Sequence, residues 1–170
     1  MTAAIAMRPY LPADAARCAQ IFRASIDELA ADDCDDEQRA AWATSADDEA
    51  AFAARLAGGL TLVATIAGAL AGFASLKGAD VIDMLYVDPH HARRGVGAAL
   101  IDALARIAQS RGLARLTSEV SDTARPLFER QGFAAQRRNL VSLDDQWLAN
   151  TTMTKDLNTD QSARPAPTKH

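Results

Sequence analysis

The alternation of apolar and polar residues divides the chain into short strands and amphipathic helices. Residues 81–87 are almost continuously apolar, which is typical of a strand covered on both faces. Asp88-Pro89 ends this strand, because proline lacks the N–H that a strand ladder needs. From Val96 onward the apolar residues recur at helical spacing, which predicts a helix that buries one face and ends near Gly112. A strand, a basic loop and a helix therefore follow one another in the centre of the chain.

The same pattern predicts the flanking elements. They are a strand at 5–10, a helix over 12–29, a helix from about 45 to 58, a strand at 113–120, a helix ending near 132, and two closing strands at 133–143 and 148–157. The loop between the closing strands is expected at 144–147. Residues 158–170 are polar with two prolines, so we expect a disordered tail after a single domain at 1–157.

Residues 59–76 carry no charge over a length close to that of a membrane span. More than half of them are Ala, Gly, Thr or Ser, and Ala67-Gly68 divides them into two short apolar runs. We therefore predict a β-hairpin here and no membrane helix.

Composition is that of one soluble globular domain. The 170 residues are 49% hydrophobic and 24% charged, and the net charge of −4 does not favour nucleic acid as a partner. Cys18 and Cys34 fit neither a disulfide framework nor a metal site, and with no signal peptide in view we expect a cytoplasmic protein. His90, His91 and His170 do not make a zinc site, so no metal is expected.

The basic loop has the chemistry of an anion site. A helix start has unsatisfied N–H groups and the positive end of the helix dipole, and Gly95 and Gly97 would leave those groups open to a phosphate. Arg93 and Arg94 add positive charge at the same point. We predict a diphosphate-binding turn; the alternative is a structural loop with two solvated arginines.

These residues resemble a known family. Leu85-Tyr-Val-Asp-Pro followed by Arg93-Arg-Gly-Val-Gly-Ala-Ala-Leu100 is similar to the acetyl-CoA signature of the GNAT superfamily of N-acetyltransferases. Residues 124–133 resemble the second hallmark of that family, a helix ending in Gly-Phe. Ala92 departs from the family pattern, which has Gln or Arg there. The resemblance implies an α/β (α+β) fold, with a mixed, twisted sheet of about six to seven strands flanked by helices.

The resemblance also implies an activity, which is transfer of acetyl from acetyl-CoA to a primary amine by direct attack in a ternary complex. Pantetheine would lie along Leu85, Tyr86 and Val87, with an N–H near Leu85 polarising the thioester carbonyl. The diphosphate would lie on the loop and the helix start; the residues implied are Arg93, Arg94, Gly95, Val96, Gly97 and Ala98. The acceptor, a small molecule or peptide, is not identified by the sequence. The C-terminal strands of such folds often join homodimers.

The proton-transfer groups are less clear. Two carboxylates are candidate bases, Asp83 on the central strand and Glu119 on the next strand. By alternation, Asp83 shares a strand face with Leu85 and Val87. Either carboxylate could instead be structural. Phe128 stands where many family members have the tyrosine that protonates the leaving thiolate, so Tyr86, Tyr10 or water would serve instead, or the thiolate would leave unprotonated. Ser121 is a possible replacement for an asparagine of the family pattern. Without catalysis, the chain would be an acyl-CoA-binding sensor of the same fold.

Two further alternatives concern the acidic run at 32–49 and the glycine motif. The acids could attract a cationic amine, but we favour the alternative that they form a solvated face and the starts of two helices. Trp42, which lies within this run, is expected to be a packing residue. A dinucleotide-binding oxidoreductase would need a third glycine where Leu100 stands, and a shorter loop before Gly95.

Overall fold

Seven strands form one twisted sheet in the computed structural model, which describes residues 4–157. The strands are β1 (Ile5–Pro9), β2 (Leu60–Ile66), β3 (Ala69–Lys77), β4 (Val81–Val87), β5 (Arg115–Ser121), β6 (Ala134–Leu143) and β7 (Gln146–Asp156). Their order across the sheet is β1-β2-β3-β4-β5-β7-β6. Only the β4–β5 pair is parallel, so the sheet is mixed, as predicted.

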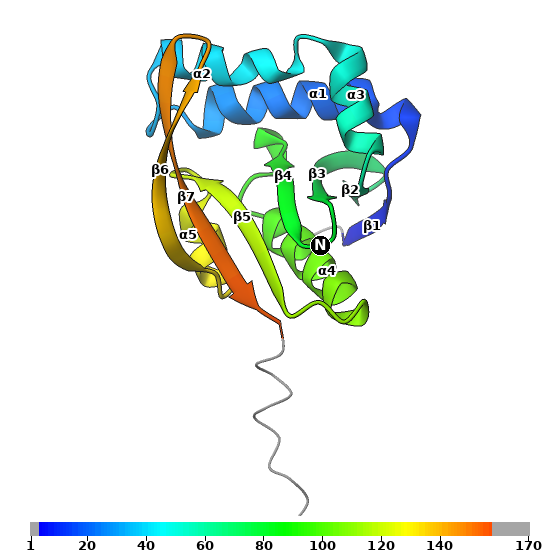
Figure 1. Cartoon of the computed structure of the whole chain (residues 1–170). Helices are drawn as coiled ribbons and strands as arrows, with labels where there is room; N and C mark the ends of the chain where they lie inside the picture. The colour runs from blue at the N-terminus through cyan, green and yellow to red at the C-terminus, as the bar shows by residue number, and fades with distance from the viewer. Residues whose placement is uncertain (1–3, 158–170) are drawn as a thin grey trace, which may run out of the picture.

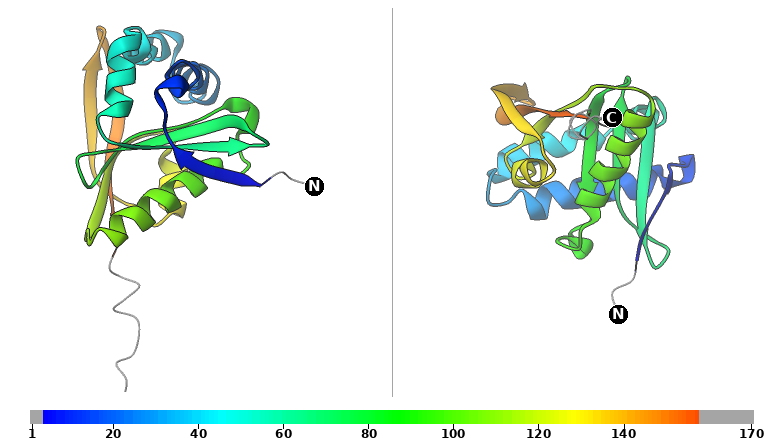
Figure 2. Two further views of the ribbon diagram at one scale, coloured as in Figure 1. Left: turned by 90° about the vertical axis from the view of Figure 1, so that its right-hand side faces the viewer. Right: turned by 90° about the horizontal axis from the view of Figure 1, so that it is seen from below.

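Helices cover both faces of the sheet. The helical elements are η1 (Pro12–Asp14), α1 (Ala15–Ala24), η2 (Ser25–Leu29), α2 (Asp36–Ala43), η3 (Thr44–Ala46), α3 (Glu49–Ala57), η4 (Pro89–His91), α4 (Val96–Ser110) and α5 (Arg125–Arg130). Helices α1, α2 and α3 lie on one face, and α4 and α5 lie on the other (Figures 1 and 2). The predicted fold class is confirmed.

Each face has its own apolar core. One cluster joins α4 to the sheet through residues such as Leu100, Leu104 and Leu116. The other joins α1 and α3 to the opposite face and includes Phe22 and Phe52, which are about 1% exposed. Burial of such large side chains is the main favourable contribution to folding, and here it fixes both helical layers on the sheet.

The two halves of the sheet separate beside β4. The ladder between β4 and β5 consists of two pairs, Val81–Thr117 and Ile82–Ser118, and toward the helices α1–α3 the strands diverge (Figure 1). On its other side β4 pairs with β3 through a β-bulge, since Leu76 is opposite Ile82 but Ser75 is opposite Met84. The extra residue is Asp83. A bulge turns the strand, so Ile82 and Met84 pack in different clusters.

The sequence predictions for the central strand, the hairpin and α4 are confirmed. Ala67 and Gly68 both have positive φ, as a two-residue hairpin turn requires. The predicted helix over 12–29 is instead a 3₁₀ turn, an α-helix and a five-residue π-helix. The predicted loop at 144–147 is shorter, because Asp144 and Asp145 form the turn and β7 starts directly after them.

Helix α2 was missed by the sequence pattern, because within it only Ala41 is buried and its apolar stripe is weak. Asp35 caps α2 by accepting a hydrogen bond from the Gln38 amide, and Asp48, not the Ser45 region, caps α3. Two acids of the 32–49 run are thus helix caps, as one interpretation of that run proposed.

Across residues 4–157, none of the helices has the length and apolar character needed to cross a membrane. The predicted tail, 158–170, lies outside the described residues.

Candidate functional site

The loop after β4 is anchored by a buried carboxylate. Asp88 is 3% exposed, forms an ion pair with Arg17 of α1, and accepts a hydrogen bond from the His90 amide at 3.0 Å. The Asp88 amide donates to the Ala71 carbonyl at 2.8 Å, which ties the same residue to β3. The start of the loop is therefore fixed to both the sheet and the helical layer. Arg17 was not anticipated, because it lies far from Asp88 in sequence.

The residues predicted to hold a diphosphate lie together at the start of α4. Gly95 precedes the helix with φ +85°, a conformation that favours glycine, and no side chain caps the helix. Arg93, Arg94 and Gly95 are exposed. The first amides of the 15-residue helix have no intrahelical acceptor, so this loop offers N–H groups, a helix dipole and two guanidinium groups to an anion.

Gly97 has a packing role that the sequence did not indicate, in addition to the predicted contact with a diphosphate. It is buried, and a Cβ added there would lie 2.7 Å from Leu127 Cδ2 of α5, so the glycine allows α4 and α5 to pack closely. A second close approach lies at Gly72 of β3, where an added Cβ would be 2.9 Å from both the Tyr86 carbonyl oxygen and Val96 Cγ1. These two glycines bring the start of α4 against β3, β4 and α5.

A channel of about 150 Å³ lies beside β4, the strand that leads into this loop. Leu85 and Val87 of β4 line it, together with Leu127 of α5 and with Ile26 and Leu29 of the π-helix η2. A π-helix is wider than an α-helix and occurs frequently at functional sites. The channel is apolar and lies beside the strand predicted to hold pantetheine.

Between the diverging strands β4 and β5 lies a smaller cavity of about 60 Å³. Phe128 lines it, is 2% exposed, and packs its ring against Phe133 with centroids 4.9 Å apart. Ser121 Oγ accepts a hydrogen bond from the Ala124 amide at 3.2 Å, which fixes the turn into α5. Ser121 also lines the channel beside β4, whereas Phe128 lines the smaller cavity and not the channel.

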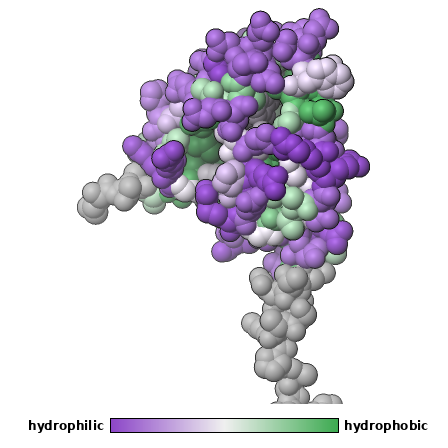
Figure 3. Space-filling model, turned by 90° about the vertical axis from the view of Figure 1, so that its left-hand side faces the viewer, coloured by the Kyte–Doolittle hydropathy of each residue, from purple (hydrophilic) through white to green (hydrophobic). Residues whose placement is uncertain are grey.

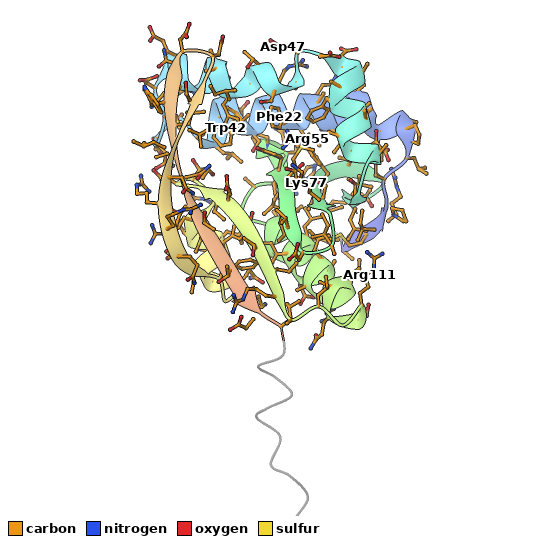
Figure 4. All side chains as sticks on the ribbon, in the orientation of Figure 1. Phe22, Trp42, Asp47, Arg55, Lys77 and Arg111 are labelled. Atoms are coloured by element: carbon orange, nitrogen blue, oxygen red, sulfur yellow. The ribbon has the colours of Figure 1, made fainter. Side chains whose placement is uncertain are left out.

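A third cavity, of about 250 Å³ and referred to below as the large cavity, lies on the side of the α1–α3 layer. It is lined by residues from α1, α2, α3, β4, β5 and the β6–β7 hairpin, among them Phe22, Gln38, Trp42, Arg55, Tyr86, Glu119, Val141, Leu143 and Leu148. Figure 4 shows Phe22, Trp42 and Arg55 between this helical layer and the upper part of β4. On the face that carries β6 and β7, apolar surface lies in a recess among hydrophilic residues (Figure 3).

The three cavities share Trp42, Tyr86 and Ser121, so they meet at one point. The Tyr86 ring contacts Phe22 at a centroid distance of 4.6 Å, Phe73 at 5.7 Å and Trp42 at 6.3 Å. Burial raises the pKa of Tyr86 to about 12, so its hydroxyl is protonated at neutral pH. Tyr10, the other tyrosine considered, lines none of these three cavities. Trp42 is thus more than the packing residue that the sequence suggested.

The two candidate bases have different surroundings. Asp83 receives two hydrogen bonds from Arg55 of α3, from Nε to Oδ2 at 2.7 Å and from Nη2 to Oδ1 at 2.9 Å. Because of the bulge it faces the α3 layer, whereas Leu85 and Val87 pack in the opposite cluster, so the face-sharing expected from simple alternation is wrong. Glu119 is exposed, lines the large cavity, and has no hydrogen-bond or ion-pair partner among residues 4–157.

Arg55 is a site residue that the sequence did not reveal, since nothing around it signals a pairing with a strand 28 residues later. Hydrogen bonding to Asp83 raises its pKa, so it is always cationic. Cys34 also lines the large cavity, and burial raises the pKa of its thiol. No group of three or more His, Cys, Asp or Glu side chains suited to a metal ion occurs in the described part of the chain.

Comparisons with known proteins agree with this arrangement. Residues 30–157 match the Acetyltransferase (GNAT) domain family. An uncharacterized N-acetyltransferase, YafP of Escherichia coli (strain K12), is 34% identical over 149 residues, which are 88% of this chain and 94% of that protein.

Solved structures with the same fold extend the comparison. A crystal structure of a GCN5-related N-acetyltransferase from Rhodopseudomonas palustris is 56% identical, with a TM-score of 0.89 over 92% of this chain and 98% of that one. The PaiA N-acetyltransferase from Thermoplasma acidophilum, crystallised in complex with coenzyme A, is 16% identical, with a TM-score of 0.74 over 90% and 99% of the two chains. The chain belongs to the GNAT superfamily of N-acetyltransferases.

Proposed function

We propose that this protein transfers an acetyl group from acetyl-CoA to the primary amine of an acceptor, by direct attack while both substrates are bound. The observation that supports this most is the meeting of three cavities at Tyr86. One lies beside β4, the strand that ends at the proposed anion-binding loop, and another is a separate cavity with an unpaired carboxylate. Donor and acceptor can therefore approach the same point from two sides, which is what a direct transfer needs.

The donor side fits acetyl-CoA. The amides and arginines at residues 93–98 would hold the diphosphate, and the apolar channel beside Leu85 and Val87 would hold the pantetheine arm. Beyond Ile82 no strand pairs with β4 on its β5 side within the described residues, which leaves backbone groups of β4 available to an extended ligand. An N–H near Leu85 would stabilise the charge that develops on the thioester oxygen.

On the acceptor side, Glu119 is our candidate for the general base. Its carboxylate is exposed to the cavity and unpaired, whereas that of Asp83 is engaged by Arg55. As the C–N bond forms and the C–S bond breaks, the proton of the attacking nitrogen would pass to Glu119, directly or through one water. Asp83 then has a positioning role, because it holds Arg55 at the cavity wall.

The leaving thiolate would be stabilised by Tyr86, since Phe128 has no hydroxyl. A phenol with a pKa of about 12 keeps its proton, so Tyr86 would act by donating a hydrogen bond to the sulfur, and the thiolate would take its proton from water. The absence of a proton-donating hydroxyl at Phe128 also supports the second candidate function, an acyl-CoA-binding sensor that does not catalyse acetyl transfer. A cytoplasmic location and a homodimer through the C-terminal strands stay predictions.

Calorimetric titration with acetyl-CoA, CoA and NADH tests the donor assignment. We expect saturable binding of acetyl-CoA and CoA and none of NADH. The double variant Arg93→Gln/Arg94→Gln should weaken binding about 10- to 100-fold, because each lost charge-assisted contact costs about 1.5 kcal/mol or more. Arg111→Gln is the matched control, because this exposed arginine lies at the other end of α4 (Figure 4).

Turnover separates the enzyme from the sensor. Release of free thiol from acetyl-CoA in the presence of primary amines, above the rate without amine, would support the transferase. Binding without any amine-dependent thiol release would favour the sensor. If acetyl-CoA does not bind at all, both functions are wrong.

A further inference from the structure

Arg55 is held in one orientation by the bulge of β4. Its Nε and Nη2 donate to the two carboxylate oxygens of Asp83 at 2.7 and 2.9 Å, a fork-to-fork geometry that fixes the plane of the guanidinium group. Asp83 is itself fixed, since it is the extra residue of the bulge and its side chain is only 18% exposed. The arginine is therefore pre-organised, with little side-chain entropy left to lose on binding a ligand.

The remaining edge of this guanidinium has no partner. Arg55 Nη1 makes no hydrogen bond or ion pair to any residue in 4–157, and the side chain is 44% exposed. Arg55 lines the large cavity but neither the channel beside β4 nor the gap between β4 and β5. Its free donors are thus available to the acceptor and not to the pantetheine arm.

Among the charged groups that line the large cavity, Glu119 is a carboxylate without any hydrogen-bond or ion-pair partner in the described chain, and Arg55 has one donor edge without a partner. Asp122 is engaged by Arg138 in two hydrogen bonds of 2.9 and 3.0 Å, and Asp33 accepts a hydrogen bond from Thr123 at 2.9 Å. Of the ionised groups that line the cavity, Glu119 and the Nη1 edge of Arg55 are left without a partner in the described chain. A ligand that satisfies both carries an amine and an anionic group.

Apolar side chains form one part of the remaining cavity wall, and the polar side chains of Gln38, Ser45, Ser121, Thr123 and Asn150 form another. Val141, Leu143 and Leu148 of the β6–β7 hairpin face the cavity, with the rings of Phe22 and Trp42 from the helical layer. Apolar walls of this kind bind a hydrocarbon or aromatic group and gain its transfer free energy. The ligand therefore has an apolar part next to its two charged groups.

We propose that the acceptor is a free α-amino acid with an apolar side chain, whose carboxylate binds Arg55 while its amine is next to Glu119. This inference rests on the proposed function and specifies its substrate. A planar carboxylate matches the planar donor edge of the arginine, and the α-amine is separated from the carboxylate by a single carbon. Arg55 is then the residue that selects carboxylated acceptors, with Asp83 positioning it.

The test compares acceptors that differ only in the carboxylate. Leucine is paired with isopentylamine, and phenylalanine with phenethylamine, at saturating acetyl-CoA, and kcat/KM is measured from thiol release. We expect the amino acid of each pair to be preferred about 10- to 100-fold, as for a charge-assisted hydrogen-bonded contact. Leucine methyl ester should behave like the amine. Aspartate, which would place a second carboxylate against the apolar wall, should be a poor acceptor.

Variants of Arg55 and Asp83 test whether Arg55 causes the preference for the amino acid over the amine. Arg55→Gln should bring the leucine-to-isopentylamine ratio close to one, Arg55→Lys should retain part of it, and Asp83→Asn should reduce it by releasing the arginine. A purely structural role of Arg55 would lower both rates and leave their ratio unchanged. Arg106→Gln, at an exposed arginine that pairs with Asp102 on α4, is the matched control and should keep the wild-type ratio.

The outcomes separate this inference from the function on which it rests. If wild type acetylates the amines as well as the amino acids, the amino-acid assignment is wrong and the acetyltransferase proposal stands. A ratio that persists in Arg55→Gln, or that keeps its full wild-type value in Arg55→Lys should the first variant not fold, would also overturn the role of Arg55. No acetyl-CoA binding and no thiol release with any acceptor would overturn both.

Discussion

Replacement of Gly72 by alanine tests the close packing behind the donor site. In the structure, a Cβ at this position would lie 2.9 Å from the Tyr86 carbonyl oxygen, 2.9 Å from Val96 Cγ1 and 3.3 Å from Leu100 Cδ1. Non-bonded carbon atoms are comfortable at about 3.5 Å or more, so neighbouring groups must move by roughly half an ångström. One of the two shortest contacts is to backbone, which cannot rotate away. The start of α4 must therefore shift relative to β3 and β4.

Overpacking of this kind costs about 1–3 kcal/mol, and the lower entropy of the unfolded alanine chain offsets about 0.4–1 kcal/mol of it. We expect the variant to lose about 1–2 kcal/mol of unfolding free energy. For a chain of 170 residues this is a decrease in Tm of about 2–8 °C. Because Tyr86 and Val96 border the donor site, the Kd for acetyl-CoA should also rise several-fold.

Urea and thermal unfolding followed by circular dichroism measure the stability, and calorimetry measures the Kd. Gly58→Ala adds the same methyl group at the end of α3, where φ is −76° and the closest atom would be 3.2 Å away, so it should change neither quantity much. If Gly72→Ala behaves like Gly58→Ala in both assays, the packing argument and the position of α4 that it implies are wrong.

Three further predictions address the reaction and the fold. Glu119→Gln should lower kcat at least 10-fold without changing the Kd for acetyl-CoA, since it removes a base but no donor contact; an unchanged kcat would reject Glu119 as the base. Tyr86→Phe should lower kcat about 10-fold, and because the pKa of Tyr86 is about 12, it should not alter the pH–rate profile between pH 6 and 9; loss of a profile limb in that range would contradict this. The third concerns Asp14, whose pKa is lowered by hydrogen bonds from Arg8 at 2.8 and 2.9 Å. This ion pair stabilises the fold fully above about pH 4, and its contribution is lost as the pH falls through the lowered pKa. The difference in Tm between wild type and Asp14→Asn should therefore be largest near neutral pH and vanish in strong acid.

The segments that form the proposed donor site could be predicted from the sequence because they are local. Strand β4, its loop and the start of α4 follow one another without interruption, so the apolar pattern, the glycines and the arginines stand in order along the chain. Even here the role of Gly97 was not visible, because its close neighbour Leu127 belongs to another helix. Periodicity shows which face of an element is buried, but not what the buried face touches.

The cavity proposed as the acceptor site could largely not be predicted from the sequence, for a related reason. Arg55 is defined by a carboxylate on a different element, and the bulge that turns Asp83 toward it leaves no signal in a simple alternation of residues. Helix α2 buries one alanine, so its apolar pattern was too weak to detect, and with it the position of Trp42 was missed. A site made from distant segments needs the tertiary structure.

The two substrate sites are encoded differently along the chain. The donor loop and the strand before it occupy one uninterrupted stretch, whereas the large cavity takes its walls from α2, α3, β5 and the β6–β7 hairpin. If the proposed function is correct, substitutions in α2 or exchange of the hairpin should change which amine is accepted while the acetyl donor stays the same. For protein engineering, the hairpin is the natural segment to graft or diversify, since within the sheet it pairs with the other strands through β7 alone. A library confined to it would search acceptor preference without risking the machinery that activates the acetyl group.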